Sequence, residues 1–208
     1  MGEGTRASRP LDHLTCLSAN RKTIEIAARH RLEPYRQGQL DGLCALYASI
    51  NALRLALAEH TRLTERRCKD LFAEGVNFLH RKDGLHTATT KGMGTKRRLA
   101  LVRHLAKHVS TMTSCLVVVE QPDHSSWSTI HDAFEWIDES LSVGKPVLIA
   151  LLGALDHYTV IAGSTAATLR LVDSTGILFI RKPSCGHRTA FHQIPFNGLL
   201  RIAIERPG

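Results

Sequence analysis

Hydrophobic residues recur at helical spacing through the first two thirds of the chain. Leu46, Ile50, Leu53 and Leu57 stand at i, i+4, i+7 and i+11, directly after the turn-forming residues 38–42. This pattern predicts an amphipathic helix that begins beside a tight turn. The same reasoning predicts further helices over residues 23–31, 64–79, 95–109 and 128–141, a loop over 84–94 and a buried strand over 116–119.

The final third of the chain changes to short β-type runs that are separated by Gly, Ser and Pro. Strands are expected over residues 146–152, 157–162, 169–172, 177–180 and 199–204. Helices therefore come first and an antiparallel sheet second, which predicts an α+β fold around one shared core. We expect a single domain over residues 23–208, preceded by a polar, flexible lead-in over residues 1–22.

Composition narrows the class of protein. The chain has 208 residues, of which 43% are hydrophobic, as is usual for a globular protein. No run reaches the ~18 uncharged apolar residues that a membrane helix needs, so a membrane-spanning function is excluded. Five cysteines without a Cys-x-x-Cys pair argue against a disulfide framework. Because the N-terminus also lacks the apolar core of a secretory signal, we expect a cytoplasmic protein, with delivery into another cell left open.

The charge is concentrated in one segment. The chain carries 27 Lys and Arg against 19 Asp and Glu, a net charge of +8. Between His80 and His108 eight basic residues stand against one acidic residue, Asp83, so this segment holds most of the excess. Such a surface can simply be solvated, or it can attract an acidic protein, an anionic membrane surface or nucleic acid. Nucleic acid is the weaker fit, because no aromatic residue interleaves with these charges.

Cys44 occupies a chemically apt position. It stands at the first turn of the predicted helix, after the turn that contains Gly38 and Gly42. Unpaired backbone N–H groups and the helix dipole stabilise negative charge there, which favours a thiolate. The same N–H groups can hold an oxyanion once a carbonyl is attacked. A buried structural cysteine is the alternative interpretation.

His157 and Asp173 complete a possible catalytic group. His157 begins one predicted strand, and Asp173 ends the next, sixteen residues later. If these strands pair as a hairpin, the two side chains lie at the same edge of the sheet. The imidazole can then take the proton of Cys44 while the carboxylate fixes its orientation. Taken singly, His157 can instead be an exposed strand-end residue, and Asp173 a turn residue in Asp-Ser-Thr-Gly.

The order of these residues resembles that of the papain-like cysteine peptidase superfamily, and most closely its compact bacterial C39-like branch. The resemblance covers residues 35–57, with Cys44, and residues 143–180, with "GKPVLI", "HYTVI" and "LVDS". It implies a papain-like fold in which the nucleophile helix packs on a C-terminal antiparallel sheet. It also implies that a glutamine upstream of the cysteine donates to the oxyanion.

That glutamine can be Gln39 or Gln37. In the family it stands six residues before the cysteine, whereas here Gln39 stands five and Gln37 seven residues before it. "DGLCALYASI" also resembles the Asp-Gly-x-Cys motif of ovarian-tumour-type deubiquitinases, which would place backbone amides near Asp41 in this role.

The expected function is therefore hydrolysis of a peptide or isopeptide bond in a protein substrate, acidic in character. Cys44 is the expected nucleophile, His157 the base, Asp173 its orienting group and Gln39, with the Cys44 N–H, the oxyanion donor. No metal or organic cofactor is expected. Two alternatives stay open. One is deamidation or acyl transfer on the same residues. The other is a non-catalytic papain-fold module that holds nucleic acid or an acidic protein on its basic helix.

Overall fold

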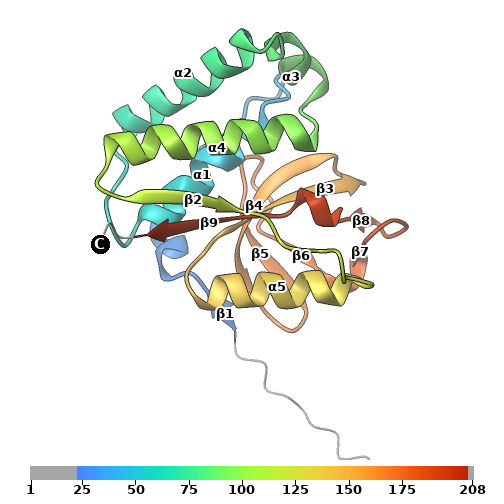
Figure 1. The fold of residues 1–208 in the computed structure, drawn as a ribbon. Helices are drawn as coiled ribbons and strands as arrows, with labels where there is room; N and C mark the ends of the chain where they lie inside the picture. The colour runs from blue at the N-terminus through green and yellow to red at the C-terminus, as the bar shows by residue number, and fades with distance from the viewer. Residues whose placement is uncertain (1–22, 206–208) are drawn as a thin grey trace, which may run out of the picture.

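The computed structural model describes residues 23–205, so the lead-in expected over residues 1–22 lies outside it (Figure 1). Within this range the chain forms five α-helices and nine β-strands, which confirms the α+β class. The helices are α1 (Cys44–Leu57), α2 (Glu65–Arg81), α3 (Leu85–Lys91), α4 (Thr95–Met112) and α5 (Ile130–Ser142). The strands are β1 (Ile24–Glu25), β2 (Leu116–Glu120), β3 (Val147–Gly153), β4 (His157–Ser164), β5 (Thr168–Val172), β6 (Phe179–Arg181), β7 (Cys185–Gly186), β8 (His192–Gln193) and β9 (Leu200–Glu205).

The main sheet is antiparallel and runs in the order β2-β9-β3-β4-β5-β6. Strands β3 to β6 follow one another as a meander, whereas β9 returns from the end of the chain to lie between β2 and β3. The short strands extend this sheet: β1 pairs with β4, and β8 pairs with β3 and, in parallel, with β7. This arrangement puts β4 in the interior of the sheet, between β3 and β5.

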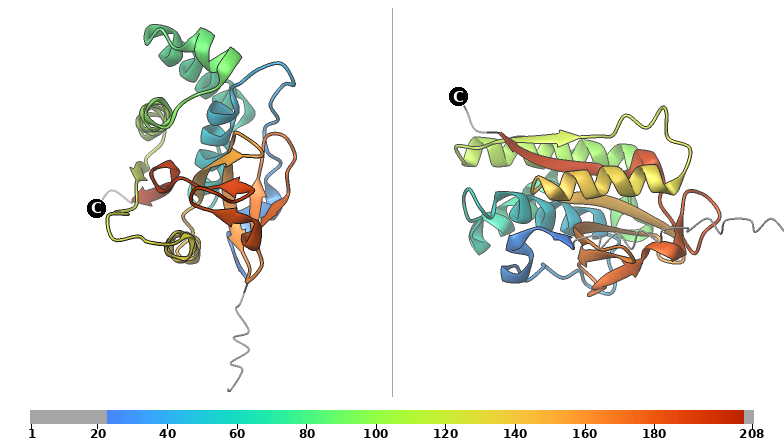
Figure 2. Two further views of the ribbon diagram at one scale, coloured as in Figure 1. Left: turned by 90° about the vertical axis from the view of Figure 1, so that its right-hand side faces the viewer. Right: turned by 90° about the horizontal axis from the view of Figure 1, so that it is seen from below.

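Helices cover both faces of the sheet. Helix α1 packs on β3, β4 and β9, and α4 packs on α1 and β2. Helix α5 lies on the other side of the sheet, where it contacts β3 and β4 (Figures 1 and 2). All eight residues of β4 are buried as a result. The nucleophile helix expected from the sequence is therefore part of the core, with twelve of its fourteen residues buried.

The expected loop over residues 84–94 contains helix α3, so that prediction is wrong. The N–H of Ala88 donates to the carbonyl of Gly84 at 2.8 Å, and the hydroxyls of Thr89 and Thr90 bond to carbonyls one turn earlier. Ala88 is fully buried. The segment offers too few apolar residues for its helical period to be visible in the sequence.

Three further predictions need correction. Residues 23–31 form strand β1 and a 3₁₀ turn, Ala27–Arg31, because the chain pairs with β4 here: the N–H of Ile26 donates to the carbonyl of Ala162 in that strand. Helix α5 begins at Ile130 rather than at residue 128, because Thr129 is its N-cap and Asp132 closes a capping box. The strand expected over 177–180 forms at Phe179–Arg181 instead.

Strand β2 is an edge strand rather than the buried strand expected. Its Leu116 is 49% exposed, and Val117 is its buried residue. Helix α4 covers one face of it. None of the helices within residues 23–205 combines the length and apolar character needed to cross a bilayer.

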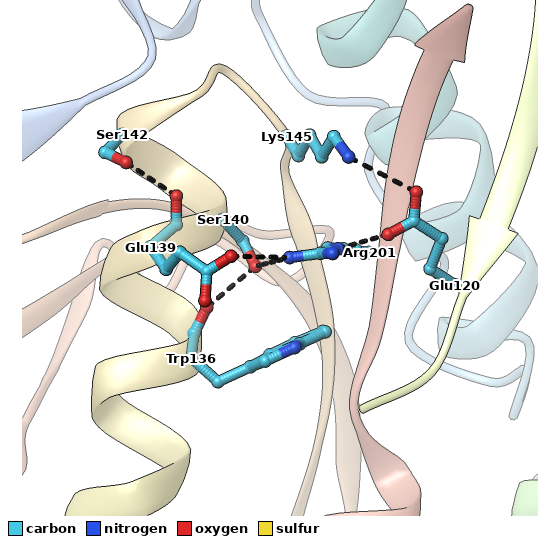
Figure 3. A network of polar contacts seen from close by, with 7 residues as sticks. All are labelled: Glu120, Trp136, Glu139, Ser140, Ser142, Lys145 and Arg201. Atoms are coloured by element: carbon cyan, nitrogen blue, oxygen red, sulfur yellow. Dashed lines mark hydrogen bonds and ion pairs between the residues drawn. The ribbon is translucent and has the colours of Figure 1, made fainter. Parts of the chain in front are cut away.

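A polar network ties α5 to this edge of the sheet (Figure 3). Arg201 of β9 donates from Nε to Glu120 of β2 at 2.5 Å and from Nη1 to the hydroxyl of Ser140 of α5 at 3.3 Å. Its guanidinium also lies 3.6 Å from a carboxylate oxygen of Glu139 and 5.2 Å from the ring centre of Trp136. One side chain thus joins β9, β2 and α5.

Candidate active site

Cys44 is the first residue of α1. The amides of Leu46 and Tyr47 both donate to the carbonyl of Leu43, so the helix begins directly at this point. In the part of the chain that the structure describes, the N–H groups of Cys44 and Ala45 meet no protein acceptor. Free N–H groups of this kind attract an anion to a helix N-terminus. Cys44 is 7% exposed.

The turn before Cys44 is fixed by its own side chains and by α3. Asp41 accepts from the backbone N–H groups of Leu43 and Gly38 at 3.0 and 3.1 Å. The N–H of Gly42 donates to the carbonyl of Thr89 at 2.7 Å. A Cβ at Gly42 would lie 2.6 Å from the carbonyl oxygen of Ala88, so only glycine fits this contact. Helix α3 therefore holds the turn that positions Cys44.

His157 and Asp173 meet as the predicted hairpin implies. Strands β4 and β5 are antiparallel, with Val160 opposite Val172. His157, the first residue of β4, therefore lies near Asp173, which directly follows β5. The Nε2 of His157 lies 2.6 Å from Oδ2 of Asp173. The other carboxylate oxygen accepts from the N–H and hydroxyl of Thr175, both at 2.7 Å, and from the N–H of Ile177 at 3.2 Å. The carboxylate is thus held on both sides.

The charges of this pair support each other. Burial alone would lower the pKa of His157, but hydrogen bonding and charge interactions with Asp173 and Cys44 raise it from 6.5 to about 9. Burial opposes ionisation of Asp173 as well, yet the hydrogen bonds from His157 and Thr175 lower its pKa well below 3.8. The imidazole is therefore cationic at neutral pH. With Nε2 committed to Asp173, Nδ1 is the ring nitrogen left for Cys44.

The other described cysteines lack this environment. Burial raises the pKa of Cys68, and it raises that of Cys185 to about 11, so both thiols stay protonated at neutral pH. Cys115 is partly exposed and directly precedes β2. Of these four free cysteines, Cys44 is the one at a helix N-terminus and beside an imidazole.

The two candidate glutamines differ in their contacts. Gln39 is exposed, and within residues 23–205 its side chain makes no hydrogen bond to protein. Gln37 is half-buried: its backbone N–H donates to the carbonyl of Ser174 at 3.0 Å, and its side-chain amide donates to the carbonyl of Asp41. Gln37 thus links the turn after Asp173 to the turn before Cys44.

The roles of two residues escaped the sequence analysis. Thr175 stands two residues after Asp173, the spacing at which an aspartate turn bonds its own backbone, so this spacing could have found it. Arg98 was counted with the basic segment, yet it is fully buried. Leu101, Val102 and Leu105 follow it by three, four and seven residues, so Arg98 lies on the same apolar face of α4 as these residues.

The basic segment is therefore less uniform than its composition indicates. Arg98 is removed from the surface, and Arg81 is paired with Glu74 at 2.8 Å. Lys96, Arg103 and Lys107 remain exposed along α4.

Neither a metal-binding cluster nor a similar known protein assigns a function to the chain. Within residues 23–205, no group of three or more His, Cys, Asp and Glu side chains is arranged to hold a metal ion. Neither a scan against protein-family models nor a search of curated proteins finds a match to the chain. The papain-like resemblance therefore stays a prediction, and the geometry of the site carries the functional argument.

Proposed function

We propose that the chain is a papain-like cysteine hydrolase that cleaves a peptide or isopeptide bond. The observation that carries this proposal is the combination of Cys44 at the N-terminus of α1 with a His157 imidazole that is bonded to Asp173 at 2.6 Å. A thiol nucleophile needs a base beside it and an orienting group behind the base, and we assign these roles to His157 and Asp173.

In the first half of the reaction, Nδ1 of His157 already carries the proton of the Cys44 thiol, so that the ring is cationic from the start, and Sγ of Cys44 attacks the carbonyl carbon. The carbonyl oxygen becomes an oxyanion, and we assign the free N–H of Cys44 as its backbone donor. When the tetrahedral intermediate collapses, the C–N bond breaks and the imidazolium gives its proton to the leaving amine. An acyl group then remains on Cys44.

In the second half, His157 takes a proton from water, whose oxygen attacks the acyl carbon. The C–S bond breaks, the carboxylic acid leaves, and the proton taken from water stays on His157 beside the released sulfur, as at the start. A side-chain amide substrate would give deamidation, and an amine in place of water would give acyl transfer. Asp173 keeps its charge throughout and holds the ring in place, because its pKa lies far below neutrality.

For the side-chain oxyanion donor we favour Gln37 over Gln39. The amide of Gln37 bonds to the carbonyl of Asp41, three residues before the nucleophile, whereas Gln39 is exposed. A second N–H on the same amide nitrogen is free to meet the substrate.

A proteome-derived peptide library tests the proposal, because no substrate needs to be chosen in advance. New N-termini should appear with the wild-type protein and not with the Cys44→Ala variant, and a Cys115→Ala variant should cleave like wild type. Conversion of side-chain amides to acids, or joined peptides, would identify the deamidase or acyltransferase alternative. The proposal is contradicted if the wild-type protein produces no new N-termini, no conversion of side-chain amides to acids and no joined peptides.

The exposed basic side chains of α4 favour an acidic substrate or binding partner. We expect cleaved peptides to be enriched in Asp and Glu, and this enrichment to weaken in an Arg103→Gln, Lys107→Gln double variant and at high salt. If instead the chain is a binding module, binding to an acidic protein or nucleic acid falls steeply with salt and is unchanged in Cys44→Ala.

A further inference from the structure

Strand β2 leaves one edge of the main sheet open. It stands at the end of the order β2-β9-β3-β4-β5-β6, and within residues 23–205 it pairs with β9 alone (Figures 1 and 2). The edge strand at the other end, β6, is three residues long, whereas β2 has five. An edge strand presents backbone N–H and C=O groups that can pair with another chain. The edge of β2 is therefore a place where a partner can add a strand.

Two hydrogen bonds show which backbone groups of β2 point outward. The N–H of Val117 donates to the hydroxyl of Ser110 in α4 at 2.9 Å, so it does not pair with β9. The N–H of Ile202, which stands opposite Val119, donates to the carbonyl of Pro146, on the side away from β2. Because these groups alternate in direction along a strand, the N–H and C=O of Val119 and the C=O of Val117 face the open edge. Among the described residues they meet no hydrogen-bond partner.

A groove follows this open edge between β2 and α4. It has a volume of about 300 Å³ and is lined by residues 116–119 of β2 and by Arg103, Ala106, Lys107 and Ser110 of α4. The last three follow Arg103 by three, four and seven positions, so the four residues form one stripe along the helix. Arg103 and Lys107 are exposed, and neither forms an ion pair with any residue of the range 23–205. The groove thus has a positive wall without a counter-charge.

The two faces of β2 offer a partner different surfaces. Glu120 bonds to Arg201, which also bonds to Ser140 of α5, so the side chain of Glu120 lies on the α5 side of the sheet. Leu116 and Val118 share this face, because side chains alternate along a strand, and Leu116 is 49% exposed. The opposite face is covered by α4 with its basic stripe. A strand added beside β2 therefore meets apolar side chains on one face and basic side chains on the other.

We propose that β2 binds an extended, acidic segment of a partner protein by strand addition. The backbone of the segment pairs with the free groups of Val119, and its acidic side chains face Arg103 and Lys107. The side chains between the acidic ones are apolar, since they pack on Leu116 and Val118. The partner is thus recognised by alternating acidic and apolar residues in an extended stretch of about five positions, the length of β2.

A second copy of this chain suits the edge less well. A symmetric pair of β2 strands would bring the two basic stripes together, and like charges repel. The one carboxylate of β2, that of Glu120, is bound by Arg201 and Lys145, so it does not oppose an acidic segment. The surface uses none of the residues of the candidate active site, so the inference does not depend on the proposed function.

The test is fluorescence anisotropy with a labelled peptide of four Glu-Val repeats, which has the alternation proposed for the partner. Wild-type protein should bind this peptide. Two further versions carry N-methyl groups on either the glutamate or the valine amides. One of them should bind at least about 10-fold more weakly and the other like the unmodified peptide, because an added strand pairs along one edge only and loses several hydrogen bonds there.

Substitutions in the protein locate the bound peptide. Val119→Pro removes an outward N–H and leaves the pairing with β9 intact, so it should weaken binding about 3–10-fold. Arg103→Gln and Lys107→Gln should each weaken it about 2–5-fold. Lys96→Gln is the matched control, because this exposed base of α4 does not line the groove. Cys44→Ala should bind the peptide like wild type, which keeps this inference separate from the proposed catalysis.

The inference is overturned if wild-type protein does not bind the peptide, or if both methylated versions bind as well as the unmodified one. In the second case the basic stripe attracts negative charge without strand addition. Displacement of the peptide by an oligothymidine that binds Val119→Pro equally well would assign the stripe to nucleic acid. Dimerisation that is lost in Val119→Pro would assign the edge to a second copy. If Val119→Pro does not fold, the methylated peptides decide with the wild-type protein.

Discussion

At the scale of single residues, the candidate site contains two kinds of group: the charged pair His157 and Asp173, and the uncharged amide of Gln37, which we propose as an oxyanion donor. The hydrogen bond between His157 and Asp173 fixes the charges of this pair, since it raises the pKa of His157 and lowers that of Asp173. Within residues 23–205 the side chain of Gln37 makes no hydrogen bond to His157 or Asp173 and instead bonds to the carbonyl of Asp41. Substitutions at these positions should therefore affect different steps of the reaction.

Replacing Gln37 by Ala should lower the rate of amide cleavage about 10²–10³-fold, because one oxyanion donor is lost. Alkylation of Cys44 by iodoacetamide forms no oxyanion and should change little. Gln39→Ala is the matched control and should cleave at nearly the wild-type rate. Loss of cleavage in Gln39→Ala, with Gln37→Ala active, would assign the donor to Gln39 instead.

The His157–Asp173 pair should make stability depend on pH in a defined way. The pKa of His157 is raised from 6.5 to about 9, so its contribution is complete below pH 6.5 and is lost as the pH rises through 9. The lowered pKa of Asp173 gives a contribution that is present above pH 3.8 and lost as the pH falls below it. The pair therefore stabilises the protein most between these two ordinary values.

Denaturant unfolding of wild type and Asp173→Asn measures this effect. Between pH 6.5 and 9 the stability advantage of wild type should shrink by about 1 kcal/mol per pH unit, because the variant lacks the carboxylate that raises the pKa of His157. A difference that stays constant over this range would show that the two groups are not coupled in the folded protein.

The sequence was informative about residues whose chemistry depends on local position. Cys44 follows a turn and opens an apolar helix, and His157 and Asp173 flank a hairpin, so their placement could be predicted. The choice between Gln37 and Gln39 could not, because it depends on which of two loop residues reaches the Asp41 turn. The burial of Arg98 was not predicted, because the residue was counted as part of a basic segment and its position on the apolar face of the helix was not considered.

At the scale of elements, α3 is a support for the nucleophile helix. It is seven residues long, yet its carbonyls at Ala88 and Thr89 contact the turn before Cys44 directly. The sequence predicted a loop here because seven residues show no clear apolar period, and most of the stability of so short a helix comes from packing. Its importance is visible only in the tertiary structure.

Gly42→Ala tests this support. The added Cβ would lie 2.6 Å from the carbonyl oxygen of Ala88, so α3 and the turn must move apart. We expect a loss of about 1–3 kcal/mol in the free energy of unfolding and slower alkylation of Cys44. Gly94→Ser is the control, because a Cβ at Gly94 has nothing within 4 Å and a serine suits the N-cap of α4. Equal effects of both substitutions would contradict the claim that α3 supports the turn before Cys44.

At the scale of the whole molecule, polar contacts on the far edge of the sheet contribute to stability without entering the site. Arg201 joins β9, β2 and α5 through Glu120, Glu139 and Ser140 (Figure 3). The pattern of helices and strands predicted both the sheet and α5. It could not predict this network, because β9 pairs with β2 from more than 80 residues away, with Glu120 opposite Arg201.

Arg201→Met should lower the free energy of unfolding by about 1–3 kcal/mol, since it removes charge-assisted hydrogen bonds from partly buried partners. The rate of Cys44 alkylation in the folded protein should stay at the wild-type value. Lys69→Met, which breaks the exposed pair with Glu65, should leave the unfolding midpoint unchanged. A change in Cys44 reactivity in Arg201→Met would mean that this edge of the sheet and the site are coupled.

The most direct test of the central claim is the rate of alkylation at each cysteine of the wild-type protein near neutral pH. Cys44 should react at least about 10-fold faster than Cys68, Cys115 and Cys185, because thiolates react and these other thiols lack its helix N-terminus and imidazole. The excess should disappear in His157→Ala. If Cys44 reacts no faster than Cys68 or Cys115, it is not an activated nucleophile and the proposed function is wrong.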